Sequence, residues 1–401
     1  MTAERTPSPP PSGRDSESRD RARDAGTDRH RDGSVDDDRE GADAEAGPPL
    51  LRVENLTTRF YTDTVVSAVD GVSYDLDAGE TLGLVGESGS GKSVSVRSLV
   101  GLVDSPGRVD DGAVYWKGQD LVGASRRELR SVRGAEIAMV FQNAQSAFDP
   151  TYTVGEQIVE AVRAHRDCSR RVARDEAAEL LREVGLPNPE SNLDAYPHEY
   201  SGGMAQRAMI AMALAGEPEL LVADEPTTGL DVSIQAGIID LFRRLVRERE
   251  MALILISHDL GVVSQVCERL LVMYAGRVVE RGTRRRILES PRHPYTRSFL
   301  ESIPDVSRRK PLSSIPGSPP NLGAPPAGCR FHPRCPVADA GLCDAERPPT
   351  VSFGDGHAAT CHAYVDAYGG PAEYDAEAVV DVVPVGADDA DAGADHGGAG
   401  R

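Results

Sequence analysis

The chain has 401 residues, of which 64 are acidic and 44 basic, so its formal net charge is −20. This acidity argues against nucleic acid as a partner, because nucleic-acid binding depends mainly on neutralising phosphates. No stretch approaches the roughly 18 consecutive apolar residues that cross a bilayer, and the N-terminus lacks an apolar signal-peptide core. We therefore expect a soluble cytoplasmic protein with room for two modest domains, at roughly 100–200 residues each.

The two ends of the chain differ in composition from its middle. Residues 1–49 contain no Leu, Ile, Phe, Tyr or Trp, and residues 364–401 carry nine acidic groups against a single Arg. Neither segment has enough apolar surface to offset the entropy lost on ordering. We expect a disordered charged tail over 1–49 and an acidic disordered tail over 364–401, although the valines at 379–385 could form one short strand.

Lysine is scarce, since only three of the basic residues are lysines. High acidity with few lysines favours a protein from a salt-accumulating halophile, where strong screening weakens the repulsion between carboxylates. A GC-rich genome would also replace Lys by Arg, so it remains an alternative explanation of the lysine shortage.

The first strong motif is a glycine-rich loop that follows an apolar run at residues 81–85 and precedes a helix start. Its glycines let consecutive backbone N–H groups approach a triphosphate closely. Lys92 would reach the β- and γ-phosphates, and Ser93 would ligate Mg²⁺. A chance glycine-rich turn is disfavoured because a rare lysine occupies the required position. The loop consists of Gly86, Glu87, Ser88, Gly89, Ser90, Gly91, Lys92 and Ser93.

A second apolar run, at residues 220–223, ends in Asp224 and Glu225. The carboxyl ends of buried parallel strands face the ligand crevice of an α/β sheet. Asp224 would hold Mg²⁺ through water, and Glu225 would polarise the water that attacks the γ-phosphate. An acidic pair of this kind is often only a solvated turn, and the presence of the phosphate loop makes that interpretation much weaker.

Two more apolar runs deliver a polar residue to the same predicted edge. Gln142 follows residues 137–141, and His258 lies two positions beyond residues 252–256. A histidine alone would more often be structural, but the repeated geometry favours a site within reach of a γ-phosphate.

Ser201 and two glycines, Gly202 and Gly203, open a predicted helix at about 203–215. Ser201 is a suitable N-cap, and the glycines leave the positive end of the helix bare, as an anion site requires. An ordinary capped helix explains the same residues equally well. The long sequence separation from Lys92 indicates that this motif need not serve the same nucleotide.

Taken in order, these motifs resemble those of an ABC-transporter ATPase subunit over about residues 50–300. The residue sequence of the phosphate loop, the methionine at 204 and the run His-Pro-Tyr-Thr at 293–296 are similar to those of the dipeptide, oligopeptide and nickel importer family. The resemblance implies an α/β fold, namely a P-loop ABC ATPase domain over 50–305 with a helical subdomain at about 143–215. A small irregular C-terminal cysteine-rich module would follow over 306–363.

The resemblance also implies partners and roles. Two ATPases, identical or different, would hydrolyse ATP beneath two membrane permeases to drive import, with an extracytoplasmic substrate-binding protein acting indirectly. The chain would be a peripheral protein on the cytoplasmic face of the membrane. Each nucleotide would lie between one subunit's phosphate loop and the partner's signature residues, Ser201, Gly202 and Gly203, close to the turn at Asp231. The catalytic set would be Lys92, Gln142, Glu225 and His258, and the Mg²⁺ set would be Ser93, Gln142 and Asp224.

An aromatic ring near the first strand should stack on adenine. We choose Tyr61, with Phe60 as the rival, because the spacing of this residue varies in the family.

The C-terminal region holds four clustered cysteines, Cys329, Cys335, Cys343 and Cys361. A reducing cytosol disfavours disulfides, so the cluster predicts a metal site. The spacing alone slightly favours Zn²⁺, whereas the resemblance implies a [4Fe-4S] cluster. Thirteen prolines between 291 and 349 predict a separate, loop-rich module outside every phosphate motif. We therefore expect ATP hydrolysis to depend little on this module.

Two other functions compete with import. One is a soluble ABC ATPase of translation or DNA repair, but such proteins carry two cassettes or a long coiled coil in one chain. The other is a regulatory module that only senses nucleotide, which the presence of Glu225 and His258 disfavours. The transported substrate stays open among dipeptides, oligopeptides, nickel and oligosaccharides.

Overall fold

The structure is a computed structural model that describes residues 47–303 and 314–365. The predictions for residues 1–46 and 366–401, including the short strand at 379–385, lie outside the described residues.

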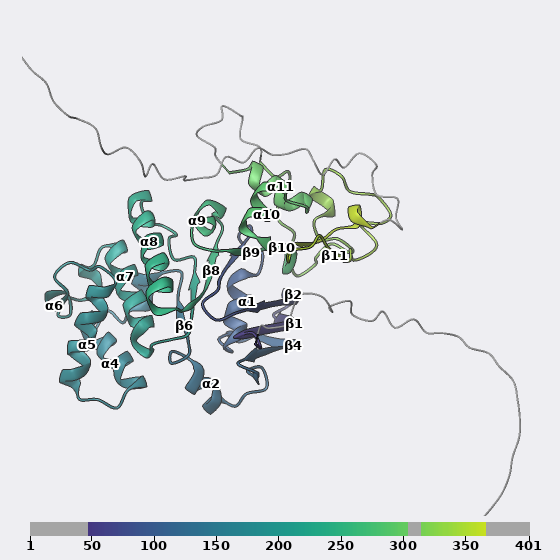
Figure 1. Ribbon diagram of the computed structural model, residues 1–401. Helices are drawn as coiled ribbons and strands as arrows, with labels where there is room; N and C mark the ends of the chain where they lie inside the picture. The colour runs from purple at the N-terminus through teal and green to yellow at the C-terminus, as the bar shows by residue number, and fades with distance from the viewer. Residues whose placement is uncertain (1–46, 304–313, 366–401) are drawn as a thin grey trace, which may run out of the picture. The chain divides into compact units, whose positions relative to one another are not determined.

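The main sheet has eight strands in the order β11-β12-β10-β9-β3-β8-β7-β6. Figure 1 labels five of them, β11, β10, β9, β8 and β6. Neighbours from β9 to β6 pair in parallel, and these strands are almost completely buried apolar runs, as expected of a sheet covered on both faces. The strands expected at 81–85, 137–141, 220–224 and 252–256 are confirmed. The bounds are β3 Thr81–Val85, β6 Ile137–Val140, β7 Leu220–Asp224, β8 Ala252–Ser257, β9 Arg269–Tyr274, β10 Arg277–Thr283, β11 Thr350–Ser352 and β12 Ala358–Thr360.

A second sheet is antiparallel, with the order β2-β1-β4-β5. Leu51 and Val69 of this sheet, Leu99 of α1, and Leu82 and Leu84 of β3 belong to one buried core. Helix α1 therefore packs between the two sheets, which fixes the loop that precedes it. The bounds are α1 Lys92–Leu99, β1 Leu51–Tyr61, β2 Val65–Leu76, β4 Gly107–Trp116 and β5 Gln119–Asp120.

The chain between the end of β6 and the start of β7 forms a layer of helices, which matches the expected helical subdomain. Several of its helices begin at side-chain caps, such as Thr153 before α4 and Ser169 before α5. Helix α5 ends before Gly185, which has a φ of 74° directly after the α5 C-cap. The bounds are α3 Ala144–Ala147, α4 Val154–His165, α5 Arg170–Glu183, α6 Pro189–Asn192, η1 Pro197–Glu199, α7 Gly202–Ala213 and η2 Leu214–Gly216.

Among the remaining helices, α9 packs on the interior strands β3 and β8, and α10 packs on β9 and β10. None of the helices in the described ranges has the length and apolar character that spanning a membrane requires. Their bounds are α2 Arg126–Val132, α8 Val232–Arg249, α9 Leu260–Ser264, α10 Arg284–Glu289, α11 Pro294–Glu301, η3 His332–Arg334 and η4 His362–Tyr364.

The cysteine-rich region is not separate from the ATPase core. Strand β12 pairs antiparallel with β10 through Glu280 with Ala359 and Arg281 with Ala358, and β11 continues the same sheet. Phe331 also joins the core that α11 and β9 share. The expectation of a separate module is therefore wrong. Proline content predicts loops, but it does not exclude short strands that complete an existing sheet edge.

Candidate functional site

The phosphate loop connects β3 to α1, and its geometry depends on glycine. Gly91 is the N-cap of α1 with a φ of 98°, and an added Cβ would lie 2.2 Å from the carbonyl oxygen of Ala68. Lys92 lies against the loop, where its Nζ donates to the carbonyl oxygens of Gly86 at 2.7 Å and Glu87 at 3.0 Å. Burial lowers the pKa of Lys92, although the carboxylates of Glu225 and Asp224 oppose this. The ammonium group is thus fixed inside the loop.

Ser93 and Asp224 meet across two elements that are far apart in the sequence. Ser93 Oγ donates to Asp224 Oδ1 at 2.7 Å, and Arg97 Nη2 lies 3.5 Å from Asp224 Oδ2. Asp224 is fully buried, and its Oδ2 accepts no hydrogen bond from the described residues. Burial raises the pKa of Asp224, while the Ser93 hydrogen bond and the Arg97 charge lower it. A buried carboxylate oxygen with spare capacity beside a serine hydroxyl fits the oxygen ligands that Mg²⁺ prefers.

Three side chains converge on one oxygen of Glu225. Oε2 accepts a hydrogen bond from Gln142 Nε2 at 2.9 Å and another from Thr228 Oγ1 at 3.0 Å, and His258 Nδ1 lies 3.4 Å away. Glu225 adopts a φ of 47°, an unusual value for a residue with a side chain. The ends of β6, β7 and β8 thus bring Gln142, Glu225 and His258 together.

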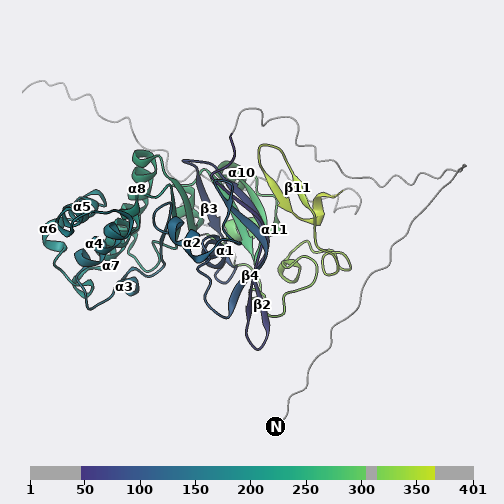
Figure 2. The same cartoon turned by 90° about the horizontal axis from the view of Figure 1, so that it is seen from below.

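The signature residues occupy a different part of the molecule. Ser201 caps α7 by accepting the N–H of Met204 at 3.3 Å, and Ser201 and Gly202 are both exposed. Gly203 is buried, where an added Cβ would lie 2.7 Å from the side chain of Ile234 on α8. Figures 1 and 2 both show α7 among α4, α5 and α6 and away from α1, which follows the phosphate loop. Asp231, the N-cap of α8, is also exposed.

Tyr61 lies at the end of β1 and is partly exposed. Its hydroxyl donates to Asp110, and the guanidinium of Arg108 lies 4.4 Å from the centre of its ring. A cation already contacts the aromatic ring, so the ring is held in a fixed orientation. Phe60, the rival, is also partly buried, and its ring lies where an added Cβ on Gly107 would come within 2.6 Å.

Two residues of the C-terminal region contact the phosphate loop, which the sequence did not predict. The hydroxyl of Tyr295 accepts the backbone N–H of Glu87 at 2.9 Å. Arg334 forms a two-pronged ion pair with the Glu87 carboxylate, at 2.6 and 3.0 Å. The C-terminal region lies outside every phosphate motif in the sequence. In the folded chain it contacts the phosphate loop, so the prediction that it is remote from the loop is wrong. No local pattern could signal a contact across 247 positions.

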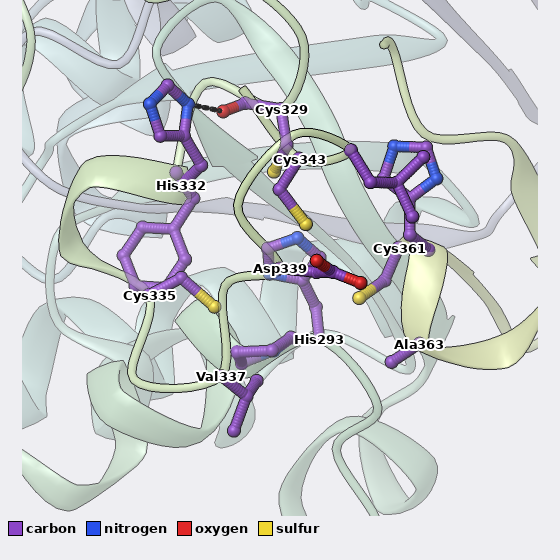
Figure 3. A pocket seen from close by; sticks show the side chains of 13 residues that line it. His293, Cys329, His332, Cys335, Val337, Asp339, Cys343, Cys361 and Ala363 are labelled. Atoms are coloured by element: carbon purple, nitrogen blue, oxygen red, sulfur yellow. Dashed lines mark hydrogen bonds between the residues drawn. The ribbon is translucent and has the colours of Figure 1, made fainter. Parts of the chain in front are cut away.

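All four clustered cysteines line one small cavity of about 30 Å³, together with His293, Phe331, Asp339 and His362. In Figure 3 the sulfur atoms of Cys335, Cys343 and Cys361 are turned toward its centre. Within the described residues, no group of three or more His, Cys, Asp or Glu side chains is arranged to hold a metal ion. The four cysteines therefore share one cavity, and the metal site remains a prediction.

Burial raises the pKa of three of the thiols that line this cavity. Burial raises the pKa of Cys335 to about 11 and that of Cys361 to about 12, and it also raises the pKa of Cys329. A thiol binds metal as the thiolate, so a metal would have to displace these protons. Four sulfur donors around one cavity match the chemistry of an iron–sulfur cluster or Zn²⁺ in donor type and number.

The sheet order, the phosphate loop and the carboxylates at the end of β7 define a P-loop ATPase of the ABC class. The family model described as "ABC transporter" matches residues 69–228, and the model described as "Oligopeptide/dipeptide transporter, C-terminal region" matches residues 279–343. Among solved structures, the ATP-binding cassette MJ0796 in a dimeric post-hydrolysis state bound to ADP and Pi has a TM-score of 0.53 and 27% identity, covering 59% of this chain and 99% of that one. The cbiO1 protein of Clostridium perfringens has a TM-score of 0.52 and 26% identity, covering 60% and 90%.

Curated relatives narrow the class to a family. The dipeptide transport ATP-binding protein DppD of Escherichia coli (strain K12) is 47% identical over 324 residues, which are 80% of this chain and 99% of that protein. DppD of Bacillus subtilis (strain 168) is 47% identical over 315 residues, which are 78% of this chain and 94% of that protein. The chain belongs to the family of ATP-binding proteins of dipeptide and oligopeptide ABC transporters, and it is an ATPase.

Proposed function

We propose that this chain powers the import of dipeptides or oligopeptides through two partner permeases, as a peripheral subunit on the cytoplasmic face of the membrane. The names of the relatives favour peptides over nickel or oligosaccharides. The match of residues 279–343 to the transporter C-terminal region also favours a transporter over an ATPase of translation or DNA repair. A substrate-binding protein outside the membrane would select the peptide and act on this chain only indirectly.

The convergence on Glu225 carries the proposal that this site hydrolyses ATP in step with transport. Glu225 accepts a proton from the attacking water as general base, and Gln142 and His258 orient its carboxylate from two neighbouring strand ends. Lys92, which is held inside the loop, would contact the β- and γ-phosphates. Ser93, Asp224 and Gln142 would hold Mg²⁺, which would neutralise charge on the phosphate oxygens.

We propose that two such ATPases, identical or different, form the complete site together. Ser201 and Gly202 are exposed, and α7 lies away from the chain's own phosphate loop (Figure 2). The positive end of α7 would therefore contact the nucleotide held by the partner subunit, with Gly203 and Asp231 at the same interface. Adenine would stack on the face of Tyr61 that Arg108 does not cover.

Uptake into proteoliposomes tests the transport function. The complex is purified through an affinity tag on this chain and reconstituted with its permeases and binding protein. Labelled dipeptide should accumulate only with Mg·ATP, and a complex carrying Lys92→Ala should not transport. Uptake of Ni²⁺ or an oligosaccharide in place of peptide would overturn the substrate class and leave the ATPase assignment intact.

We further propose that the cysteine cavity receives a [4Fe-4S] cluster, with Zn²⁺ as the alternative occupant. Its ligands would be Cys329, Cys335, Cys343 and Cys361. The proposal is supported by the fact that all four line one cavity. The cluster's role would be structural, since it lies in the region that continues the main sheet. Anaerobically purified protein should contain iron and acid-labile sulfide in about equal amounts, near four each per chain. Stoichiometric zinc without sulfide would identify the alternative.

The acidic, lysine-poor composition supports one more proposal, that the protein is adapted to high salt. Its excess carboxylates would repel one another in dilute buffer and less so in concentrated salt.

A further inference from the structure

Glu87, the second residue of the phosphate loop, forms hydrogen bonds through its carbonyl oxygen, its N–H group and its carboxylate. Its carbonyl oxygen accepts the ammonium of Lys92 at 3.0 Å, and its N–H donates to the hydroxyl of Tyr295 at 2.9 Å. Its carboxylate accepts two hydrogen bonds from Arg334. The first contact belongs to the loop itself, and the other two come from the C-terminal region of the chain.

Arg334 is held rigidly. Its side chain is 5% exposed, and it points its Nε at the carbonyl oxygen of Pro316 at 2.7 Å. Nη1 also donates to the hydroxyl of Tyr274 at 3.2 Å, in addition to its bond to Glu87. The planar fork of a guanidinium matches both oxygens of a carboxylate, which the single ammonium of lysine cannot do. The hydrogen bond to Glu87 raises the pKa of Arg334, so the guanidinium stays charged.

The second anchor, Tyr295, is fixed by aromatic packing. Its ring lies 4.6 Å from that of Tyr274 and 5.4 Å from that of Phe331, measured between ring centres. Tyr295 is fully buried, and its hydroxyl is the acceptor for a loop N–H. Phe331 and Arg334 both lie between the cavity cysteines Cys329 and Cys335, so one short segment packs against Tyr295 and carries Arg334.

We propose that Arg334 and Tyr295 are positioning residues of the ATP site, which hold the phosphate-binding loop through Glu87 in the shape that receives the nucleotide's phosphates. A displaced Glu87 would move the carbonyl oxygen that fixes Lys92, and with it the ammonium group. This proposal rests on ATP binding alone and not on the transported substrate or the occupant of the cysteine cavity.

Nucleotide affinity tests the proposal in the full chain. Mg·ATP binding is measured by displacement of a fluorescent ATP analogue, together with kcat, KM and the melting temperature without nucleotide. Arg334→Met should raise the Kd for Mg·ATP about tenfold and raise KM with it, while kcat changes little, because the loop contacts the phosphates in ground and transition state alike. The Kd of Arg334→Lys for Mg·ATP should lie between those of the wild type and Arg334→Met, since lysine keeps the charge but loses the two-pronged geometry.

A double-mutant cycle shows whether Arg334 acts through Glu87. Glu87→Gln should weaken ATP binding to a similar degree, and Glu87→Gln with Arg334→Met should bind no more weakly than the weaker single variant, because both remove the same link. Additive losses would show that Arg334 acts by another route and would overturn the proposal.

Two further variants separate positioning from general stability. Tyr295→Phe removes only the hydroxyl and keeps the ring packing, so it should fold and should raise the Kd about threefold. Arg286→Met breaks an exposed ion pair with Asp355 that joins α10 to the same C-terminal region, and it should leave the Kd unchanged. If Tyr295→Phe and Glu87→Gln bind Mg·ATP as the wild type does, the contacts serve only folding and the proposal is wrong, whether or not Arg334→Met folds.

Discussion

The side-chain amide of Gln142 donates a hydrogen bond of 2.9 Å to Glu225, although the two residues are 83 positions apart. Gln142 follows β6 and Glu225 follows β7, which pair in parallel, so their carboxyl ends lie at one edge of the sheet. This contact orients the carboxylate that we assign as general base.

Replacing Glu225 by Gln removes the base and keeps the shape of the side chain. We expect hydrolysis to slow by roughly 10²–10⁴-fold, the usual contribution of a general base, while ATP binding is retained. The bound nucleotide should then persist, and an ATP-bound dimer should accumulate on size-exclusion chromatography. Wild-type turnover by this variant would remove Glu225 from the base role.

The cysteine cavity predicts the iron content of substituted proteins. Serine at Cys329, Cys335, Cys343 or Cys361 should abolish the iron and sulfide measured in anaerobically purified protein, because each change removes one thiolate ligand. Cys168→Ser is the matched control, since Cys168 is a free thiol outside the cavity. Full iron in all four cavity variants would contradict the assigned ligand set.

Asp70 joins β2 to the C-terminal region through two arginines. Its Oδ2 lies 2.8 Å from Arg277 and 2.6 Å from Arg330, whose side chain is 6% exposed. Asp70→Asn would leave Arg330 buried without its charged partner, so the free energy of unfolding should fall by about 2 kcal/mol after allowance for partial solvent screening. Urea unfolding measures this loss. The exposed pair of Asp355 with Arg286 is the control, and Asp355→Asn should change stability by less than about 0.5 kcal/mol.

The contacts of Asp70 with Arg277 and Arg330 also predict a pH dependence of stability. Burial acts to raise the pKa of Asp70, but the charges of Arg277 and Arg330 outweigh it and lower the pKa below the usual aspartate value. A carboxyl group with a lowered folded-state pKa stabilises the protein fully above its unfolded value, about 3.9, and loses this contribution as the pH falls through the lowered value. The difference in stability between the wild type and Asp70→Asn should therefore be constant near pH 7 and shrink below about pH 4. A difference that grows on acidification would reverse the assigned sign.

The acidic composition predicts a dependence on salt. Moving the protein from molar KCl to roughly 0.1 M salt lengthens the screening distance from about 3 to 10 Å, so repulsion among the excess carboxylates should lower the melting temperature. Differential scanning calorimetry in the two buffers checks this. Equal melting temperatures would favour codon bias as the origin of the lysine shortage.

The sequence by itself indicated the residues of the proposed nucleotide site, because its motifs are local. The loop at 86–93 and the polar residues after the runs at 137–141, 220–223 and 252–256 could be placed at one sheet edge without coordinates. Parallel strands have only one arrangement of their carboxyl ends, so a strand pattern fixes where such residues meet. The helical layer was expected from the resemblance to the ABC family, and the side-chain caps that begin several of its helices act within a few residues.

Only the tertiary structure decided how the C-terminal region relates to that site. Proline and cysteine spacing indicated loops and a shared cavity, but the pairing of β12 with β10 and the contact of Arg334 with Glu87 depend on which surfaces meet after folding. A strand of three residues carries almost no periodicity, and an ion pair between distant residues leaves no local pattern. The contact between the cysteine-rich region and the phosphate loop therefore depends on the tertiary fold, and no motif in this sequence predicts it.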